Sequence, residues 1–351
     1  MQTKILKIDN DHLDDDSAMR EAAEALRAGE LVAFPTETVY GLGADALRPE
    51  AARKIYAAKG RPSDNPLIIH ICKFEQLGLI AREVPPEAKK LAEAFWPGPL
   101  TMIVWKNEKV PYETTGGMDT VAVRMPGHPA ALKLIEQSGC LIAAPSANLS
   151  GRPSPTEAEH VAEDMDGRIP IILDGGPVGI GLESTIIDLT EKTPMILRPG
   201  YITQAMLREV LGTEVVTDPG IIAADSAKKP KAPGMKYRHY APKADLALVE
   251  GEAGAVIEAI NRLVREKQAE GLKVGVIATD ETKSFYRADY VVTVGARSDE
   301  DAIAKHLYKI LREFDEWKVD AIYSESFSTP RIGQAIMNRL MKAAGHQVIN
   351  V

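Results

Sequence analysis

The sequence predicts an α/β protein with two domains, and three observations lead to this fold class. Short apolar runs alternate with longer segments whose apolar residues recur at helical spacing, as in a sheet with helices packed on it. At 351 residues the chain is long for a single hydrophobic core. A stretch rich in proline, lysine and small residues interrupts the pattern. We therefore expect a larger domain at 1–212, a linker at 213–243 and a smaller Rossmann-like α/β domain at 244–351.

The first domain begins with a predicted strand at 4–8 and a helix at about 15–28. The acidic start of this helix and the glycine that follows it are typical of helix ends. Further short apolar runs predict strands at 31–35, 67–71, 100–105, 120–125, 141–145, 170–173, 184–189 and 195–198. Helical spacing predicts helices at 50–58, 86–95, 129–138, 156–165 and 203–211. The result is a large sheet with helices packed on it.

The second domain repeats the alternation on a smaller scale. Strands are predicted at 246–249, 273–278, 290–294 and 321–324, and helices at 253–269, from about 299, and at 332–343. In the helix from 299, apolar residues recur at the spacing of one buried face. The domain lacks the Gly-x-Gly-x-x-Gly fingerprint that would indicate a dinucleotide.

The overall charge and the absent motifs narrow the function. A formal net charge of -8 argues against a protein that chiefly grips nucleic acid by its phosphates. No segment approaches the apolar length of a membrane span, and no targeting pattern opens the chain, so we expect a cytoplasmic protein without a membrane partner. P-loop, zincin and nucleophile-elbow motifs are absent. This favours catalysis by positioning and charge neutralisation.

Polar residues gather at the ends of predicted strands in the first domain, where open α/β sheets place their ligands. In FPTETVYGLGADA (34–46), hydroxyl and carboxylate side chains precede two glycines; a plain strand-to-helix connection is the alternative. In KGRPSDNPLIIHI (59–71), Lys59 and Arg61 stand on a proline-braced loop and fit a polyphosphate clamp, although a solvated helix end also tolerates them. His70 is either a core histidine or a ligand contact.

Four more clusters follow later strands. Arg124, in DTVAVRMPGHP (119–129), either pairs with a buried carboxylate or binds the carboxylate of a ligand. Ser146, Asn148 and Ser154, in APSANLSGRPSPT (144–156), are either turn residues or contacts to a phosphate or ribose. DGGPVGIGLESTIIDL (174–189) brings a glycine-rich loop to Ser184, and LRPG (197–200) ends a strand at Arg198.

These motifs, together with WPGPLT and in this order and spacing, resemble the threonylcarbamoyl-AMP synthases of the YrdC family. The resemblance covers essentially the whole first domain and implies a YrdC-like twisted open sheet with helices. The motif GMKYRHYAP followed by a second α/β domain resembles the longer form, in which an ordered linker joins a smaller Rossmann-like domain.

The resemblance implies a nucleotidyltransferase that converts L-threonine, bicarbonate and ATP to threonylcarbamoyl-AMP and pyrophosphate. Bicarbonate is then a co-substrate, and Mg²⁺ arrives on the ATP phosphates, without a metal site on the protein. Other proteins transfer the threonylcarbamoyl group to tRNA. Carried over by motif, the ATP-binding residues are Lys59, Arg61, Ser63, Thr120, Ser146, Asn148, Ser154, Arg198, Tyr237 and His239, with Lys59 and Arg61 as the catalytic pair. The threonine-binding residues are Thr36, His70, Arg124, Ala144 and Ser184.

The linker motif predicts a lid. The product is a mixed anhydride that water destroys, so a site that makes it gains from a cover that excludes solvent. Tyr237 and His239 lie in a basic and aromatic segment that would supply such a cover; packing against the second domain is the alternative. Two other functions stay open: a double-stranded RNA or tRNA-binding module, and an ATP-dependent carbamoyl or adenylyl transferase with another acceptor.

Overall fold

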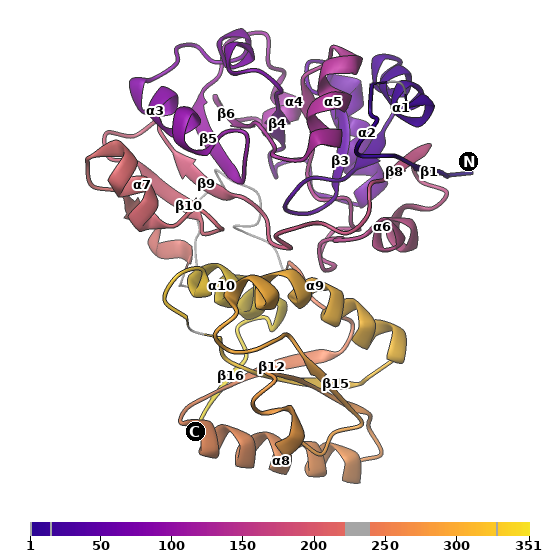
Figure 1. The fold of residues 1–351 in the computed structure, drawn as a ribbon, viewed down its shortest axis with the longest axis vertical. Coiled ribbons are helices and arrows are strands. Elements are labelled where there is room, and N and C mark those ends of the chain that lie inside the picture. The colour runs from indigo at the N-terminus through magenta and orange to yellow at the C-terminus, as the bar shows by residue number, and fades with distance from the viewer. Residues whose placement is uncertain (1, 15, 222–238, 328) are drawn as a thin grey trace. The chain divides into compact units, whose positions relative to one another are not determined.

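The computed structural model describes residues 2–14, 16–221, 239–327 and 329–351. They belong to two compact units (Figure 1). The first comprises Met1–Ser150, Ser154–Gly179 and Glu183–Lys236, and the second Gly151–Pro153, Ile180–Leu182 and Tyr237–Val351. Each unit has its own sheet and helices, which confirms the α/β class.

The first unit contains most of the elements. Its strands are β1 (Lys4–Lys7), β2 (Val32–Phe34), β3 (Gly41–Asp45), β4 (Ile68–His70), β5 (Leu100–Trp105), β6 (Thr120–Arg124), β7 (Ile142–Ala143), β8 (Ile171–Asp174), β9 (Thr185–Asp188), β10 (Met195–Arg198) and β11 (Val216–Thr217). Its helices are α1 (Ser17–Arg27), α2 (Pro49–Lys59), α3 (Pro86–Phe95), α4 (Tyr112–Thr115), α5 (Pro129–Ser138), α6 (Ala158–Met165) and α7 (Gln204–Leu211), with 3-10 turns η1 (Phe74–Leu79) and η2 (Pro219–Ile221).

The strands form one mixed, 11-stranded sheet in the order β1-β8-β2-β3-β7-β4-β6-β5-β9-β10-β11. β4 pairs with β6 in parallel, and β5 pairs with β6 in antiparallel orientation. This register places His70 and Thr101 on either side of Arg124. Residues that are opposite one another in a sheet present their side chains on the same face, so these three side chains share a face.

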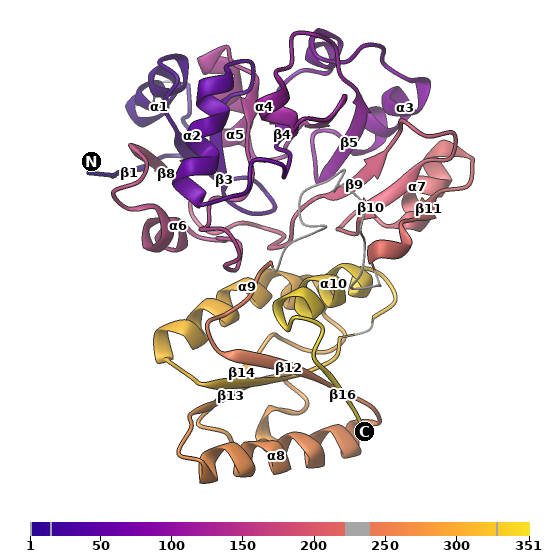
Figure 2. The same cartoon turned by 180° about the vertical axis from the view of Figure 1, so that it is seen from behind.

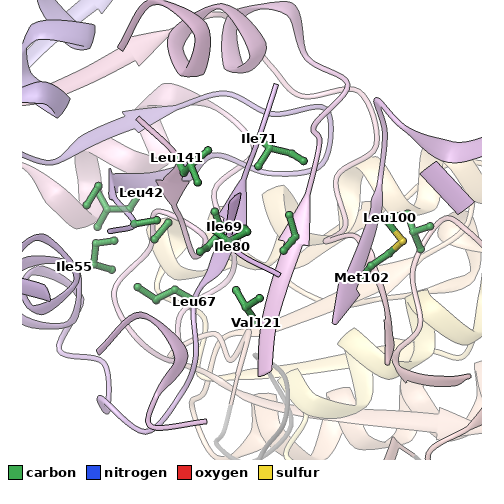
Figure 3. Packing of buried hydrophobic residues seen from close by; sticks show 14 of the residues in the cluster. Leu42, Ile55, Leu67, Ile69, Ile71, Ile80, Leu100, Met102, Val121 and Leu141 are labelled. Atoms are coloured by element: carbon green, nitrogen blue, oxygen red, sulfur yellow. The ribbon is translucent and has the colours of Figure 1, made fainter. Parts of the chain in front are cut away.

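The two faces of the sheet are buried differently. One face packs against α2, α3, α6 and α7 and forms the main core, part of which is drawn in Figure 3. Of the other face, the half near β2 and β7 is covered by α1 and α5, which lie beside each other in Figure 1. The remaining half carries a small apolar cluster made only of strand residues: Ile68, Ile103, Ala122, Ile186 and Leu197. We call this cluster the strand floor.

Side chains two residues apart in a strand point to the same face of the sheet, and this places several polar residues on the face that carries the strand floor. His70 follows Ile68 by two residues, and Thr120 and Arg124 flank Ala122 by two residues on either side. Ile142 of the half covered by helices is the register partner of His70, so both halves belong to one face. The polar ends of β4 and β6 therefore lie beside the part of this face that helices α1 and α5 leave uncovered.

The main departure from the predicted elements is β3, which occupies a segment expected as a connection with two glycines. Its glycines serve packing: a Cβ on Gly43 would lie 2.8 Å from the Phe34 ring and from Ile142. Neither Gly41 nor Gly43 has a positive φ. Glycine is needed in this strand because the neighbouring side chains come too close for any other residue.

The second unit is a smaller, wholly parallel sheet with the order β14-β13-β15-β12-β16. Its strands are β12 (Asp245–Glu250), β13 (Val274–Ala278), β14 (Tyr290–Thr293), β15 (Ala321–Glu325) and β16 (Val348–Asn350). Figure 2 shows α8 (Ala253–Ala269) on one face and α9 (Glu300–Trp317) and α10 (Gly333–Ala343) on the other, with η3 (Lys283–Phe285) after β13. This is the predicted Rossmann-like sandwich. None of the described helices, in either unit, has the length and apolarity of a membrane span.

Candidate functional site

Lys59 lies at the last position of α2 and holds the loop that follows β7. Its ammonium donates to the Ser146 carbonyl (2.5 Å) and to the Asn148 carbonyl, and its own carbonyl accepts from the Ser150 backbone (2.9 Å). Ser146 Oγ also donates to Asn148 Oδ1 (2.5 Å). Lys59 is 2% exposed. The Lys59 ammonium therefore lies beside the hydroxyl of Ser146 and the amide of Asn148 and fixes the backbone that carries them.

Arg61 follows the left-handed Gly60 that ends α2, and its guanidinium braces the next turn of the chain. It donates to the carbonyls of Asn65 (3.3 Å) and Pro66 (3.1 Å). The side chain is half-buried, whereas Ser63 at the tip of the same loop is exposed. Arg61 thus lies two residues beyond Lys59. Its guanidinium fixes the shape of the loop to which it belongs.

Ser154 connects the loop after β7 to the segment before β9. Its hydroxyl donates to Glu183 Oε1 (2.6 Å), and both residues are buried. Thr120 begins β6 and lies on the same face as Arg124, four residues further on. Ser154 therefore links, through Glu183, to the neighbouring Ser184.

Arg124 is the centre of a second group of polar side chains. Its Nη1 donates to Thr38 Oγ1 (3.0 Å), its Nε donates to the Gly98 carbonyl (3.3 Å), and its Nη2 lies 2.7 Å from Glu37 Oε1. Thr38 in turn shares a hydrogen bond with Thr36 (2.9 Å). Arg124 is 4% exposed. Its three guanidinium nitrogens therefore have fixed partners inside the protein. A planar guanidinium held in this way is suited to bind a carboxylate.

Ser184 joins β5 to the end of β10. Its hydroxyl shares a hydrogen bond with Thr101 (2.7 Å) and accepts one from Arg198 Nη2 (3.1 Å), while Arg198 Nε donates to its carbonyl (3.1 Å). Thr101 is the register partner of Arg124. The Ser184 group and the Arg124 group are therefore neighbours across the β5–β6 pair.

A bulge gives Arg198 its direction. Ile196 pairs with Ile187, but the register shifts and Arg198 pairs with Ile186. Ile187 and Ile196 belong to the main core, whereas Ile186 belongs to the strand floor on the opposite face. Regular alternation would leave Arg198 on the side of the main core; the bulge turns it toward Ser184.

His70 is buried between the apolar half of the face and Arg124. It contacts the Phe34 ring edge-on at 6.2 Å, and its Nδ1 lies 3.2 Å from the Ile68 carbonyl. Burial, followed by the positive charge of Arg124, lowers the pKa of His70 to about 3. The imidazole is therefore neutral at physiological pH. Ala144, also buried, donates its backbone N–H to the Ile68 carbonyl (2.8 Å).

Several of the residues singled out in the sequence meet in three hydrogen-bonded groups of the first unit: Lys59 with Ser146 and Asn148, Arg124 with Thr36 through Thr38, and Ser184 with Arg198. Ser63 stands apart at an exposed turn. His239 belongs to the second unit, where its ring lies 5.6 Å from Tyr240, which packs on Tyr308 at 5.2 Å. Tyr237 lies outside the described residues, so its predicted place in the site stays a prediction.

Sequence reasoning gave no role to three residues that contact the predicted site residues: Glu37, Thr38 and Thr101. The first two were visible within PTETVYGLG as polar side chains, but nothing in the pattern showed that they face Arg124. Thr101 lies within an apolar strand and gave no signal, since its role depends on the β5–β6 register.

Comparison with known proteins identifies close relatives over nearly the whole chain. Residues 24–200 match the Sua5, YciO and YrdC family model, described as telomere recombination. Residues 202–345 match the model of the threonylcarbamoyl-AMP synthase C-terminal domain. The threonylcarbamoyl-AMP synthase of Bacillus subtilis is 53% identical over 335 residues, 95% of each chain. That of Pyrococcus abyssi is 53% identical over 333 residues, 95% of this chain and 96% of the relative.

The solved structures agree. The crystal structure of Pyrococcus abyssi Sua5 complexed with L-threonine has a TM-score of 0.92 to this chain. The two are 50% identical, and the match covers 99% of this chain and 100% of the other. The similarity therefore includes both units.

Proposed function

The chain belongs to the threonylcarbamoyl-AMP synthase family, and from this membership we propose how its residues make threonylcarbamoyl-AMP from L-threonine, bicarbonate and ATP. The threonine amine first joins bicarbonate with loss of water and forms a carbamate. A carbamate oxygen then attacks the α-phosphorus of ATP, and the bond to the β-phosphate breaks as pyrophosphate leaves. Negative charge accumulates on phosphate oxygens during this second step, so cations and hydrogen-bond donors would accelerate it.

We assign the nucleotide to the group around Lys59. The residues that we propose as contacts to ATP are Lys59, Arg61, Ser63, Thr120, Ser146, Asn148, Ser154, Arg198, Tyr237 and His239. The observation that supports this assignment most is the buried Lys59 ammonium, bonded to the Ser146 and Asn148 carbonyls. Its positive charge is held in place before the nucleotide binds, as preorganised transition-state stabilisation requires. Arg61, on its self-braced loop, is the second charge of the clamp.

Magnesium is proposed to enter with the ATP phosphates. The described residues contain no group of three histidine, cysteine or acidic side chains placed to hold a metal ion, and the donors around Lys59 are carbonyl, hydroxyl and amide groups. Such a site fits a metal that keeps its phosphate and water ligands. Bound in this way, Mg²⁺ would neutralise charge on the leaving pyrophosphate.

We assign threonine to the group around Arg124. Its members are Thr36, His70, Arg124, Ala144 and Ser184. Arg124 is proposed to bind the substrate carboxylate, because its guanidinium is buried and oriented by Thr38 and the Gly98 carbonyl. The neutral His70 and the hydroxyl of Ser184 would hydrogen-bond to the substrate without adding charge beside Arg124.

The first experiment measures pyrophosphate release with ATP, magnesium, bicarbonate and L-threonine, omitting one component at a time. We expect release to require all four and to fall by at least about a hundredfold in Lys59→Ala, since one preorganised donor contributes roughly that factor. Arg61→Ala should fall as well. Lys54→Ala is the matched control: Lys54 lies on the same helix but donates to Gly29 and Glu30. Release that persists without threonine would exclude threonine as the acceptor.

Threonine is separated from other acceptors by a panel of amino acids in the same assay. Arg124 binds a group that all amino acids carry, so selectivity must come from contacts to the side chain. Comparable rates with serine and threonine would favour a transferase with a broader acceptor range. We expect a clear preference for threonine.

The linker at 213–243 is proposed to join a catalytic domain at 1–212 to the small domain at 244–351 and to cover the site. The support is chemical: a mixed anhydride survives longer where water is excluded. Replacing both Tyr237 and His239 with alanine should lower turnover or increase AMP leakage, measured as AMP formed per pyrophosphate released. Unchanged kinetics and product yield would contradict the lid. We place the reaction in the cytoplasm, with tRNA threonylcarbamoyl-transfer proteins as the consumers of the product.

A further inference from the structure

Glu37 is the one acidic side chain that the described residues place against Arg124. Its Oε1 lies 2.7 Å from Arg124 Nη2, and the carboxylate side chain is 17% exposed. The short distance does not have the direction of a hydrogen bond, and neither Glu37 oxygen has a hydrogen-bond partner although both are buried. A buried carboxylate normally accepts several hydrogen bonds. Glu37 therefore keeps acceptor capacity beside the proposed carboxylate site.

Arg124 keeps matching donor capacity on the same side. Its Nε and Nη1 are bonded to Gly98 and Thr38, whereas Nη2 makes the ion pair and no hydrogen bond. An incoming carboxylate would therefore meet Nη2, next to Glu37.

The pair presents opposite charges next to each other, which is the complement of a zwitterion. An α-amino acid carries its ammonium and its carboxylate on one carbon, so both charged groups need partners within a few ångströms of each other. Nη2 of Arg124 and Oε1 of Glu37 are 2.7 Å apart. Charge-assisted hydrogen bonds to both groups would then form together when the substrate enters.

We infer that Glu37 binds the α-ammonium group of the amino-acid substrate while Arg124 binds its carboxylate, so that Glu37 is a specificity-determining residue. This inference rests on the proposed function, in which Arg124 binds threonine. The site then selects free α-amino acids and disfavours ligands that lack the ammonium group, because such ligands lose the charge-assisted hydrogen bond to the Glu37 carboxylate.

The test compares two ligands that differ only at the α-position. L-threonine carries an ammonium there, and the matching 2,3-dihydroxybutyrate carries a hydroxyl. Both are titrated into the full-length protein by calorimetry, without ATP or bicarbonate. The variants are Glu37→Gln and, as matched control, Glu113→Gln, which removes another carboxylate paired with an arginine, Arg53, outside the site.

We expect Glu37→Gln to weaken threonine binding about tenfold or more, the effect of losing a hydrogen bond between charged groups. Binding of the dihydroxy acid should change by less than about twofold, so that the preference between the two ligands collapses. Glu113→Gln should change neither. Equal weakening of both ligands would overturn the inference, since it would mean that Glu37 only orients Arg124. Unchanged threonine affinity would overturn it as well.

Two further variants show whether a change in binding comes from the Glu37 charge, from misfolding, or from a wrong assignment of Arg124. Glu37→Asp keeps the charge and should retain part of the preference for threonine, and its loss of all preference would count against the inference. Arg124→Lys should weaken both ligands. Failure of the wild-type protein to bind threonine, or an Arg124→Lys variant that binds both ligands normally, would refute the proposed threonine site itself and not only the role of Glu37.

Discussion

At the scale of single residues, Arg124 offers the sharpest prediction about substrate binding. Lysine would keep the charge but not the planar fork, so it would not bond to Gly98, Thr38 and a ligand together. We expect Arg124→Lys to raise the KM for threonine by about one to two orders of magnitude, the loss of one or two charged hydrogen bonds. The KM for ATP should change by less than about twofold. Steady-state pyrophosphate release measures both, with Arg53→Lys as an exposed control; equal changes in the two KM values would contradict the assignment.

His70 makes the folded protein sensitive to acid. Its pKa is about 3 in the folded protein and about 6.5 in the unfolded chain. Between these values the unfolded chain binds the additional proton, so stability falls as the pH drops below 6.5. One proton contributes at most about 1.4 kcal/mol per pH unit, or about 2 kcal/mol between pH 6.5 and 5. Burial also lowers the pKa of His128, which acts in the same direction.

We therefore expect His70→Gln to lose less stability than the wild type between pH 7 and pH 5, measured by urea unfolding at each pH. His12→Gln is the control, because His12 is exposed and Asp9 raises its pKa, which gives the opposite sign. The same pH dependence in His70→Gln and in the wild type would show that the buried imidazole is not the source of the effect.

At the scale of elements, the turn that leads from β10 to α7 depends on Gly200, which packs against the start of β9. A Cβ at Gly200 would lie 2.4 Å from the Thr185 nitrogen and 2.8 Å from the Ser184 carbonyl carbon. Backbone atoms cannot yield as a flexible side chain does, so Gly200→Ala should shift Ser184 away from Thr101 and Arg198. We expect a loss of about 1–3 kcal/mol in stability and a clear loss of activity. Gly78→Ala is the control, since a Cβ there meets no atom within 4 Å; normal activity in Gly200→Ala would refute this account.

The elements also show what a sequence can predict. Long periodic segments such as α8 and α9 follow from hydrophobic spacing alone. β3 does not, because its glycines resemble turn residues until the Phe34 ring is placed over them. The sequence also does not reveal the bulge in β10. MILR has the pattern of a regular strand, and only the shift in register brings Arg198 to Ser184. The placement of these polar residues at strand ends was therefore predictable, whereas the contacts between them were not.

At the scale of the whole molecule, the α/β class follows from the alternation of strands and helices, but the strand order does not. β5 lies between β6 and β9, and β8 lies between β1 and β2. Lys4 of β1 pairs with Ile171 of β8, and Val32 of β2 pairs with the same residue, and no local pattern specifies pairs so far apart in the sequence. The pairing of β5 with β6 and β9 is also what brings Thr101 to Arg124 and Ser184. The geometry of the site is thus a property of the complete sheet.

Charge distribution at this scale predicts weak binding to tRNA itself. The formal net charge is -8, and Lys59, Arg124 and Arg198 are at most 5% exposed. Buried cations can bind the phosphates of a single nucleotide, but they cannot contact successive phosphates along a nucleic-acid backbone. We expect labelled tRNA to bind with a Kd no tighter than about 10 µM at 0.15 M salt, within the non-specific range, and to weaken steeply as salt rises. Fluorescence anisotropy at several salt concentrations measures this. Submicromolar binding that resists salt, and that Lys59→Ala or added ATP abolishes, would instead mean that the site itself recognises nucleic acid.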